Sequence, residues 1–222
     1  MTESSSLLQR GLWKDNPALV QLLGLCPLLA VTTTVVNATL LGIATMAVLL
    51  ATNTVISLLR HALVPSVRIP LFVLIIASFV TAADLLINAL FHDLHLLIGL
   101  FIPLIITNCA ILAQAETVAS KAGLRTAVTS ALGVGLGFLG ALVALGAIRE
   151  VLGQGTLFSG FEMLFGEAGA ALEIAMPFSG ALAVVLAPGA FFGLALLIAG
   201  RNFITQRANR SASALEPNKQ DT

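Results

Sequence analysis

Two cysteines are the residues in this sequence with the clearest potential for chemistry. Cys26 directly precedes Pro27, Cys109 follows Pro103 closely, and both thiols lie within apolar runs. An isolated cysteine in such a run is usually an inert packing residue. Two cysteines this far apart do not make a disulfide framework. Zinc and iron–sulfur sites take about four ligands, so a metal site here requires ligands from another chain.

The composition is that of a membrane protein. Hydrophobic residues make up 58% of the chain and charged residues 10%, against roughly a quarter charged in soluble domains. A soluble core could not bury this excess, so lipid is the solvent for most side chains. The formal charge is zero, which excludes nucleic acid as a partner.

Six apolar segments of spanning length predict an all-α integral membrane protein. They are residues 17–36, 39–59, 69–90, 95–115, 127–149 and 177–200, each close to the ~20 residues that cross a bilayer. Residues 1–16 form an N-terminal tail, 17–200 a single membrane domain and 201–222 a polar, disordered C-terminal tail. Asn16 as N-cap and Pro17 after it predict that the first helix starts there.

The basic residues sort onto one side of the predicted membrane domain. The positive-inside rule then places both termini in the cytoplasm, and only an even number of spans preserves the partition. Apart from Arg149, every lysine and arginine belongs to this set: Arg10, Lys14, Arg60, Arg68, Lys121, Arg125, Arg201, Arg207, Arg210 and Lys219.

Segments 17–90 and 95–200 are predicted to be two inverted three-helix repeats, with broken helices at the two cysteine segments. Residues 24–29 resemble residues 99–105, and a threonine follows the proline in each. Inverted repeats with helices broken near mid-membrane commonly build sites there. Cys26 lies roughly 14 Å and Cys109 roughly 20 Å along their segments, from opposite faces, which places both thiols near the bilayer centre. Pro27 predicts non-helical backbone beside Cys26.

Several charged residues carry alternative interpretations. Asp84 falls in the third segment, either as an ion-coupling carboxylate or as a hydrated boundary residue. Arg149 and Glu150 are predicted to anchor the fifth segment at the interface or to contact a second protein. His92 and His95 share a short outer loop and are expected to be solvent-exposed.

One glycine motif is rejected as a nucleotide site. Residues 135–140 match Gly-x-Gly-x-x-Gly, but a dinucleotide site needs a strand before the motif. Gly133 and Gly137 predict close helix packing instead.

Four blocks of sequence together resemble the NqrD/RnfE family, and most closely its RnfE branch, which belongs to the Rnf ion-translocating complexes. The blocks are residues 24–33, 68–78, 103–109 and 149–158, and the likeness runs from Asn16 to Arg201. The Cys26-Pro27 pair favours the Rnf type. Where the family tends to have Gly-Arg-Ala-Glu, this chain has Ala-Gln-Ala-Glu with Gln114 in place of arginine, so a positive charge is missing there.

The resemblance implies a function that composition could not show. The complex would couple electron transfer between NADH and ferredoxin to ion translocation, so this chain is a translocase component that is not catalytic alone and carries no flavin. Cys26 and Cys109 would provide two ligands of a membrane-embedded [2Fe–2S] cluster. Asn108, Thr107 and Thr32 are candidate hydrogen-bond donors to its sulfurs.

The resemblance also implies partners. A homologous six-span RnfA-like subunit of opposite orientation would provide the other two cysteine ligands. Flavoprotein and ferredoxin-type subunits would complete the complex in the lipid bilayer of a bacterial inner membrane. Three alternatives remain: an NqrD-type component of the sodium-pumping NADH:quinone reductase, a stand-alone inverted-repeat transporter, and a structural anchor with replaceable cysteines. The choice between Na⁺ and H⁺, the direction of electron flow and the pathway served are not determined by the sequence.

Overall fold

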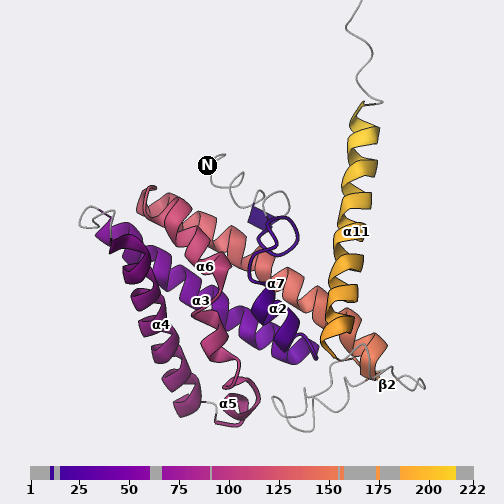
Figure 1. The fold of residues 1–222 in the computed structure, drawn as a ribbon, viewed down its shortest axis with the longest axis horizontal. Coiled ribbons are helices and arrows are strands. Elements are labelled where there is room, and N and C mark those ends of the chain that lie inside the picture. Colours follow the sequence, from indigo (N-terminus) through magenta and orange to yellow (C-terminus); the bar gives the residue numbers. More distant parts are fainter. Residues whose placement is uncertain are drawn as a thin grey trace, which may run out of the picture.

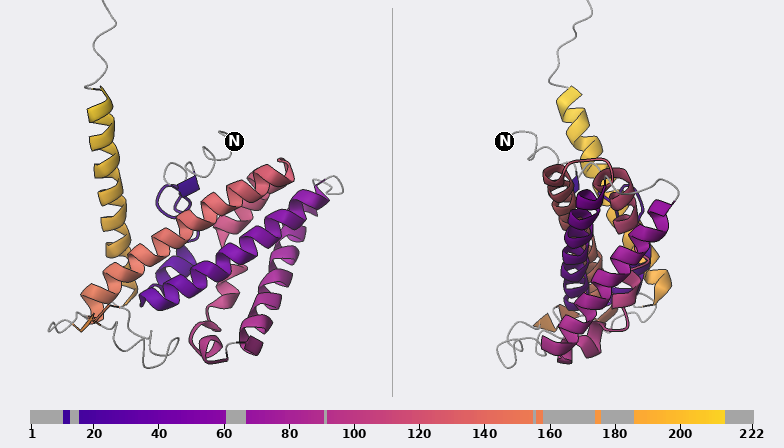
Figure 2. Two further views of the ribbon diagram at one scale, coloured as in Figure 1. Left: turned by 180° about the vertical axis from the view of Figure 1, so that it is seen from behind. Right: turned by 90° about the vertical axis from the view of Figure 1, so that its left-hand side faces the viewer.

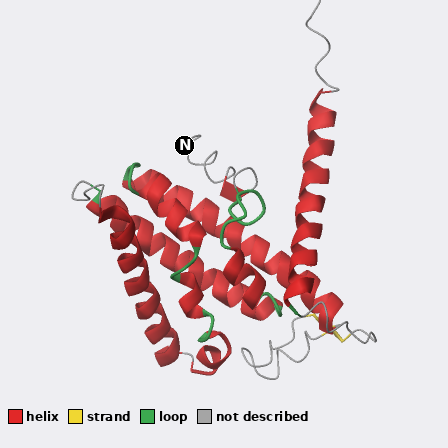
Figure 3. Ribbon diagram, viewed as in Figure 1, coloured by secondary structure: helices red, strands yellow, loops and turns green. Residues whose placement is uncertain are grey.

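Helices dominate the computed structural model, which describes residues 11–12, 16–60, 67–90, 92–154, 156–157, 174–175 and 186–213 (Figures 1 and 3). A two-residue antiparallel ladder pairs β1 (Thr156–Leu157) with β2 (Ile174–Ala175). The helices in chain order are α2 (Leu25–Val31), α3 (Val35–Leu59), α4 (Arg68–Leu90), α5 (His92–Ile98), the 3₁₀ helix η3 (Ile102–Ile105), α6 (Cys109–Gln114), the π-helix η4 (Ala115–Ala119), α7 (Leu124–Gln154) and α11 (Ala187–Ser213).

Within the described residues, five helical segments are long and apolar enough to cross a membrane. They are Val35–Leu59, Arg68–Leu90, Ile102–Ala119, Leu124–Gly153 and Ala187–Arg207. The prediction of a helical multi-span membrane protein is therefore confirmed. The bounds of α3 and α4 agree closely with the predicted segments 39–59 and 69–90, and α7 extends the predicted 127–149 at both ends.

The predicted first apolar segment, residues 17–36, is not one continuous helix. Asn16 does accept hydrogen bonds from the backbone N–H groups of Ala18 and Leu19, as a cap would. However, Asn16 also donates to the carbonyl of Gly137 on α7, and residues 17–20 form turns. Leu22 and Gly24 have positive φ values of 54° and 73°, which end any helical path before Leu25. Helix α2 then covers only seven residues, roughly 10 Å.

Pro27 lies inside α2 and not in non-helical backbone as predicted. As the third residue of the helix, it occupies the first turn, where a backbone N–H has no intrahelical partner to lose. The non-helical stretch lies just before Cys26, at residues 21–24.

The later predicted segments also differ from the structure. Segment 95–115, for which a broken helix was predicted, is a series of four short elements, α5, η3, α6 and η4. Segment 177–200 begins among residues that the structure does not describe, and α11 continues past it to Ser213. The first part of the predicted disordered tail is therefore helical; residues 214–222 lie outside the described residues, as do residues 1–10 and 13–15 of the N-terminal tail.

The centre of the fold is the antiparallel pair of long helices α3 and α7 (Figures 1 and 2). Gly135 of α7 lies against Met46 of α3, and Gly146 lies against Ala38. Gly137 is closely packed, but its neighbours are the carbonyl of Gly11 and the side chain of Asn16 and not another spanning helix as predicted. The rejected glycine motif lies within α7, so it has no strand before it.

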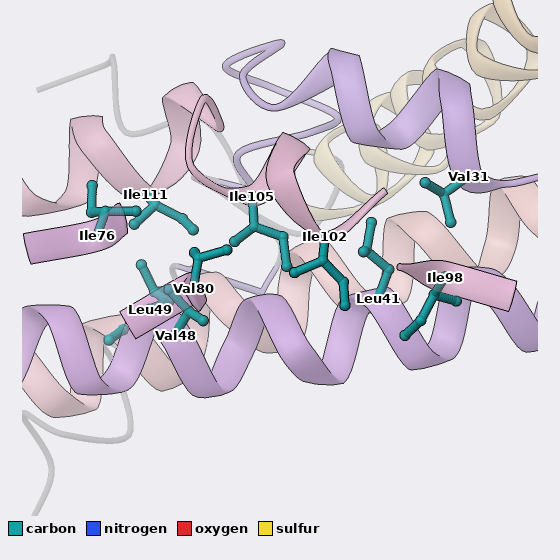
Figure 4. Packing of buried hydrophobic residues seen from close by; sticks show 11 residues of the cluster. Val31, Leu41, Val48, Leu49, Ile76, Val80, Ile98, Ile102, Ile105 and Ile111 are labelled. Carbon is teal, nitrogen blue, oxygen red and sulfur yellow. The ribbon is translucent and has the colours of Figure 1, made fainter. Parts of the chain in front are cut away.

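The largest apolar core joins α3 and α4 to the short elements that precede and contain Cys109. Ile98, Ile102 and Ile105 pack on one side of α3 together with Ile111 (Figure 4). This burial holds the short helices in place although they lack the length to be stable alone. The remaining labelled members of the cluster are Val31, Leu41, Val48, Leu49, Ile76 and Val80.

The ends of the helices that carry basic residues lie on the same side of the molecule. The end of α3, the start of α4, the start of α7 and the end of α11 lie together in the upper half of Figure 1. Arg60, which directly follows α3, lies close to Gly123, which directly precedes α7. The tertiary structure thus brings the described basic connectors together at one end of the bundle.

Candidate functional site

The two cysteine segments meet in the tertiary structure. Cys26 is the second residue of α2 and Cys109 the first residue of α6, so both thiols belong to the first turn of a short helix. The backbone N–H of Gly24, two residues before Cys26, donates a hydrogen bond to Cys109 Sγ at 3.1 Å. Both cysteines are exposed at the surface of the chain. Each thiol therefore lies at the N-terminal end of a short helix.

Gly24 makes this approach of the two segments possible. Its φ of 73° lies in the left-handed region, which side chains with a Cβ rarely adopt. A Cβ at this position would lie 2.8 Å from Asn108 Oδ1 and 2.8 Å from a ring carbon of Phe138. Gly24 is therefore a functional residue that sequence reasoning included in a motif without giving it a role. The sequence signal for this role was a glycine two residues before a candidate ligand, Cys26.

We expect Gly24→Ala to destabilise the fold by about 2–5 kcal/mol, since left-handed backbone costs about 1–2 kcal/mol and overpacking about 1–3 kcal/mol. Thermal unfolding in detergent measures this loss. Gly140→Ala is the matched control, because a Cβ there meets nothing within 4 Å and alanine favours the helix. Equal melting temperatures for the two variants would contradict this account of Gly24.

Asn108 connects the thiol segments through its side chain. Its Oδ1 accepts the backbone N–H of Ala110 at 3.0 Å and so caps α6 directly before Cys109. The residue is 1% exposed, and its Nδ2 is buried with no hydrogen-bond partner among the described residues. A buried amide N–H without an acceptor is unfavourable. The Asn108 amide therefore has donors available beside Cys109.

The other two candidate donors lie in different surroundings. Thr107 is exposed, and its hydroxyl donates to the carbonyl of Leu104 at 3.3 Å. Thr32 is buried at the opposite end of α2 from Cys26, where its hydroxyl donates to the carbonyl of Leu28 at 2.6 Å. Asn108 and Thr107 therefore lie beside Cys109, which they precede in the sequence. Thr32 lies at the other end of α2 from Cys26.

Two thiols and nearby N–H donors suit a soft metal, but they form only half of a four-ligand site. No group of three or more His, Cys, Asp or Glu residues that could hold a metal occurs in the described part of the chain. The exposed thiols leave room for ligands from elsewhere. The chemical capacity of this chain is therefore that of a partial ligand set.

Arg149 and Glu150 are buried, which contradicts the prediction that they anchor α7 at the interface. They are 2% and 0% exposed. Arg149 Nη1 donates to the carbonyl of Leu29 at 3.0 Å and to Thr32 Oγ1 at 2.9 Å, at the C-terminal end of α2. Glu150 Oε2 accepts the backbone N–H of Val35 at 2.7 Å, at the start of α3.

This arrangement matches charge to helix polarity. The guanidinium of Arg149 lies at the negative end of α2, and the carboxylate of Glu150 lies at the positive end of α3. The two residues thus hold the turn between the cysteine helix and the central helix against α7. The prediction of an interfacial anchor failed because the three groups that bind Arg149 and Glu150 belong to residues more than a hundred positions away.

Asp84 pairs with His95, which was predicted to be solvent-exposed. His95 Nε2 lies 2.8 Å from Asp84 Oδ1, with side chains 25% and 39% exposed respectively. His95 belongs to α5, which folds back on the end of α4. The expectation of an exposed His95 is therefore wrong, whereas His92 is exposed and contacts Asn88.

The position where the sequence departs from the NqrD/RnfE pattern is also buried. Gln114, the last residue of α6, is 8% exposed and its Nε2 donates to Ser130 Oγ on α7 at 2.7 Å. A neutral amide thus fills this site and ties α6 to α7.

Comparisons with known proteins agree with these features. The family model described as "Rnf-Nqr subunit, membrane protein" matches residues 4–198. A protein of Thioalkalivibrio sulfidiphilus, described as the E subunit of an ion-translocating oxidoreductase complex, is 53% identical over 206 residues, covering 92% of this chain and 90% of that protein. Proteins with the same description from Pseudoalteromonas atlantica and Vibrio cholerae are 49% and 48% identical, each covering 99% of this chain and 95% of the relative.

Proposed function

The chain belongs to the Rnf-Nqr family of membrane proteins, and from this premise we propose that it acts as the E subunit of an Rnf-type ion-translocating oxidoreductase complex. The relatives with that description cover nearly the whole chain at about half identity. This supports the Rnf type over the quinone-reductase alternative and over a stand-alone transporter. As part of such a complex it takes part in the oxidoreductase reaction and does not turn over substrate alone.

Cys26 and Cys109 provide two of the four cysteine ligands of a [2Fe–2S] cluster in this proposal. The observation that carries it is the hydrogen bond from the Gly24 N–H to Cys109 Sγ, which joins the segment of Cys26 to the Cys109 thiol across 85 residues of sequence. The residues fit the group: soft ligands, a backbone N–H directed at sulfur, and the buried Asn108 amide, whose Nδ2 has no acceptor among the described residues. A [2Fe–2S] centre, when bound, accepts and returns one electron.

This chain's own groups set the environment of that electron carrier. N–H donors to a ligating sulfur stabilise its negative charge, so the Gly24 N–H and the Asn108 amide favour the reduced state. The cap that Asn108 makes on α6 orients Cys109. The Arg149 contacts hold the far end of α2 and thereby orient Cys26.

The remaining ligands come from a homologous RnfA-like subunit in opposite orientation. Its site would mirror this one, since each cysteine helix here is followed by a long central helix, α3 or α7. The proposal includes two inverted repeats and cytoplasmic termini in a bacterial inner membrane, with electrons passing between NADH and ferredoxin. Exposure of both thiols in the isolated chain supports a partner at this surface.

Co-expression of this chain with its opposite-facing homologue tests the shared site. The co-purified pair, reduced with dithionite, is expected to show a [2Fe–2S] electron paramagnetic resonance signal. Each chain purified alone is expected to lack it, because two thiols hold no stable cluster. A colourless, signal-free pair would contradict the proposal, and so would a full signal from this chain alone.

Asp84 is proposed to take part in ion coupling, as a carboxylate within a membrane span that binds His95. We expect Asp84→Asn to lower ion-coupled turnover of the reconstituted complex by about tenfold, since hydrogen bonds to charged groups contribute roughly 1.5–3 kcal/mol. The iron–sulfur signal should persist. His92→Gln is the control, being an exposed histidine of the same short helix as His95. Unchanged coupling in Asp84→Asn would refute the role.

A further inference from the structure

Three side chains at the contact between α3 and η4 have buried polar atoms without hydrogen-bond partners in the described chain. They are Thr52 and Asn53 on α3, both 0% exposed, and Glu116 in the first turn of η4. The atoms are Thr52 Oγ1, Asn53 Oδ1 and Nδ2, and Glu116 Oε2. Buried polar groups of folded proteins are almost always satisfied, so a cluster of exceptions indicates a missing ligand, ion or water.

Thr52 shows that the lack of partners is specific to this place. Thr39, Thr45 and Thr54 on the same helix each donate their hydroxyl to the carbonyl four residues earlier, at 2.8, 2.7 and 2.7 Å. The Thr52 hydroxyl is buried and makes no such bond within the described residues. A helical threonine normally satisfies itself in this way, so the Thr52 oxygen remains available to something that the chain does not provide.

The neighbouring apolar contacts place the three side chains at one level of the bundle. Leu49, one turn before Asn53, packs in the same cluster as Ile111 of α6. Ile56, one turn after Asn53, packs with Ala115 and Ala119 of η4. The α3 face that carries Thr52 and Asn53 therefore lies opposite the junction of α6 and η4. Glu116 lies at this junction, where a π-helical turn replaces the α-helix; such turns occur frequently at functional sites.

We propose that Thr52, Asn53 and Glu116 provide side-chain oxygens for a Na⁺ site inside this chain, at the contact of α3 with η4. A hydroxyl, an amide carbonyl and a carboxylate are the ligands that hard cations prefer. The Glu116 charge is neutralised by a single monovalent ion, which relieves the penalty of a buried carboxylate oxygen.

A basic residue on the neighbouring helix α4 favours a monovalent ion over a divalent one. Arg68 lies one turn before Phe72, which packs against Ala115 and Ala119, and its Nε is also buried without a partner among the described residues. Arg68 and Glu116 form no ion pair in the described chain. A positive charge on this side of the bundle disfavours a divalent cation. This inference deepens the proposed function and rests on it, since an internal Na⁺ site matters only if the chain serves ion translocation.

The test counts bound sodium in the purified complex. Equilibrium binding of ²²Na⁺ is measured in choline buffer of constant ionic strength for the wild type, Thr52→Val and Glu116→Gln. Thr45→Val is the matched control, because Thr45 is a buried threonine of the same helix whose hydroxyl is already bonded. We expect both site variants to bind about one Na⁺ fewer per complex than the wild type and the control. The melting temperature of Thr52→Val should rise less on addition of NaCl.

Equal sodium stoichiometry in the wild type and both site variants would overturn the proposal. This includes the result that none of the three proteins binds sodium. The iron–sulfur signal, recorded on the same samples, separates this failure from that of the proposed function. If the wild type shows a normal iron–sulfur signal and all samples bind the same amount of sodium, only the sodium site is disproved. If the wild type lacks the iron–sulfur signal but the two site variants bind less sodium than the wild type, only the cluster assignment is disproved.

Discussion

Replacing Cys26 or Cys109 by alanine is expected to remove the [2Fe–2S] signal of the co-purified pair completely. Each thiol provides one of four ligands, and a cluster with three cysteines loses both a bond to iron and its closed coordination. The alanine side chain removes little packing, because both cysteines are exposed at the surface of this chain. The partner should therefore still co-purify, at least in part. The measurement is electron paramagnetic resonance of the reduced pair, normalised to protein.

Thr117→Ala is the control for the cysteine variants. Thr117 lies in η4, follows Cys109 in the same segment, is exposed, and donates its hydroxyl to the carbonyl of Ala113. Its alanine variant should keep the full signal. Retention of the signal in Cys26→Ala, with the partner bound, would disprove the ligand assignment.

The second large effect is expected at Arg149. Arg149→Met keeps the approximate length of the side chain but leaves the Leu29 carbonyl and the Thr32 hydroxyl without this donor, beside the buried carboxylate of Glu150. Removing one charge from a buried polar arrangement costs about 3–5 kcal/mol. We expect a large drop in the melting temperature of the purified complex and a lower yield.

Arg125→Met gives the comparison for this variant. Arg125 lies near the start of the same helix and is exposed, so its loss should change stability by no more than about 0.5 kcal/mol. Similar melting temperatures for the two variants would show that the Arg149 contacts contribute little. A normal melting temperature with an altered iron–sulfur spectrum would instead limit Arg149 to orienting α2.

The long spans were predictable from the sequence because hydropathy and length suffice for them. Helices α3 and α4 begin and end within a few residues of their predicted bounds. The interpretation of Asn16 as a cap was also sound locally, since its side chain binds two following N–H groups. It did not lead to a helix because Leu22 and Gly24 turn the backbone. Positive φ at a leucine has no signature in a single sequence.

The roles of the charged residues depended on partners that only folding brings together. Arg149 and Glu150 lie at the end of an apolar segment, which is typical of interfacial anchors. Their actual partners belong to residues 29–35, and the polarity of two helix ends decides the sign of each charge. His95 likewise became a partner of Asp84 only because α5 folds back on α4.

Composition, spacing and motifs were enough to predict a helical membrane protein, to single out two cysteines as candidate metal ligands, and to indicate the family that the chain resembles. These are local properties, and they can be read along the chain without knowing which residues meet. The contact of the two thiol segments through Gly24, the hold of Arg149 and Glu150 on the cysteine helix, and the buried, unpartnered polar atoms of the described Thr52, Asn53 and Glu116 came from the tertiary structure alone. Such features depend on contacts between distant residues, because the energy of a buried polar atom is set by its neighbours in space.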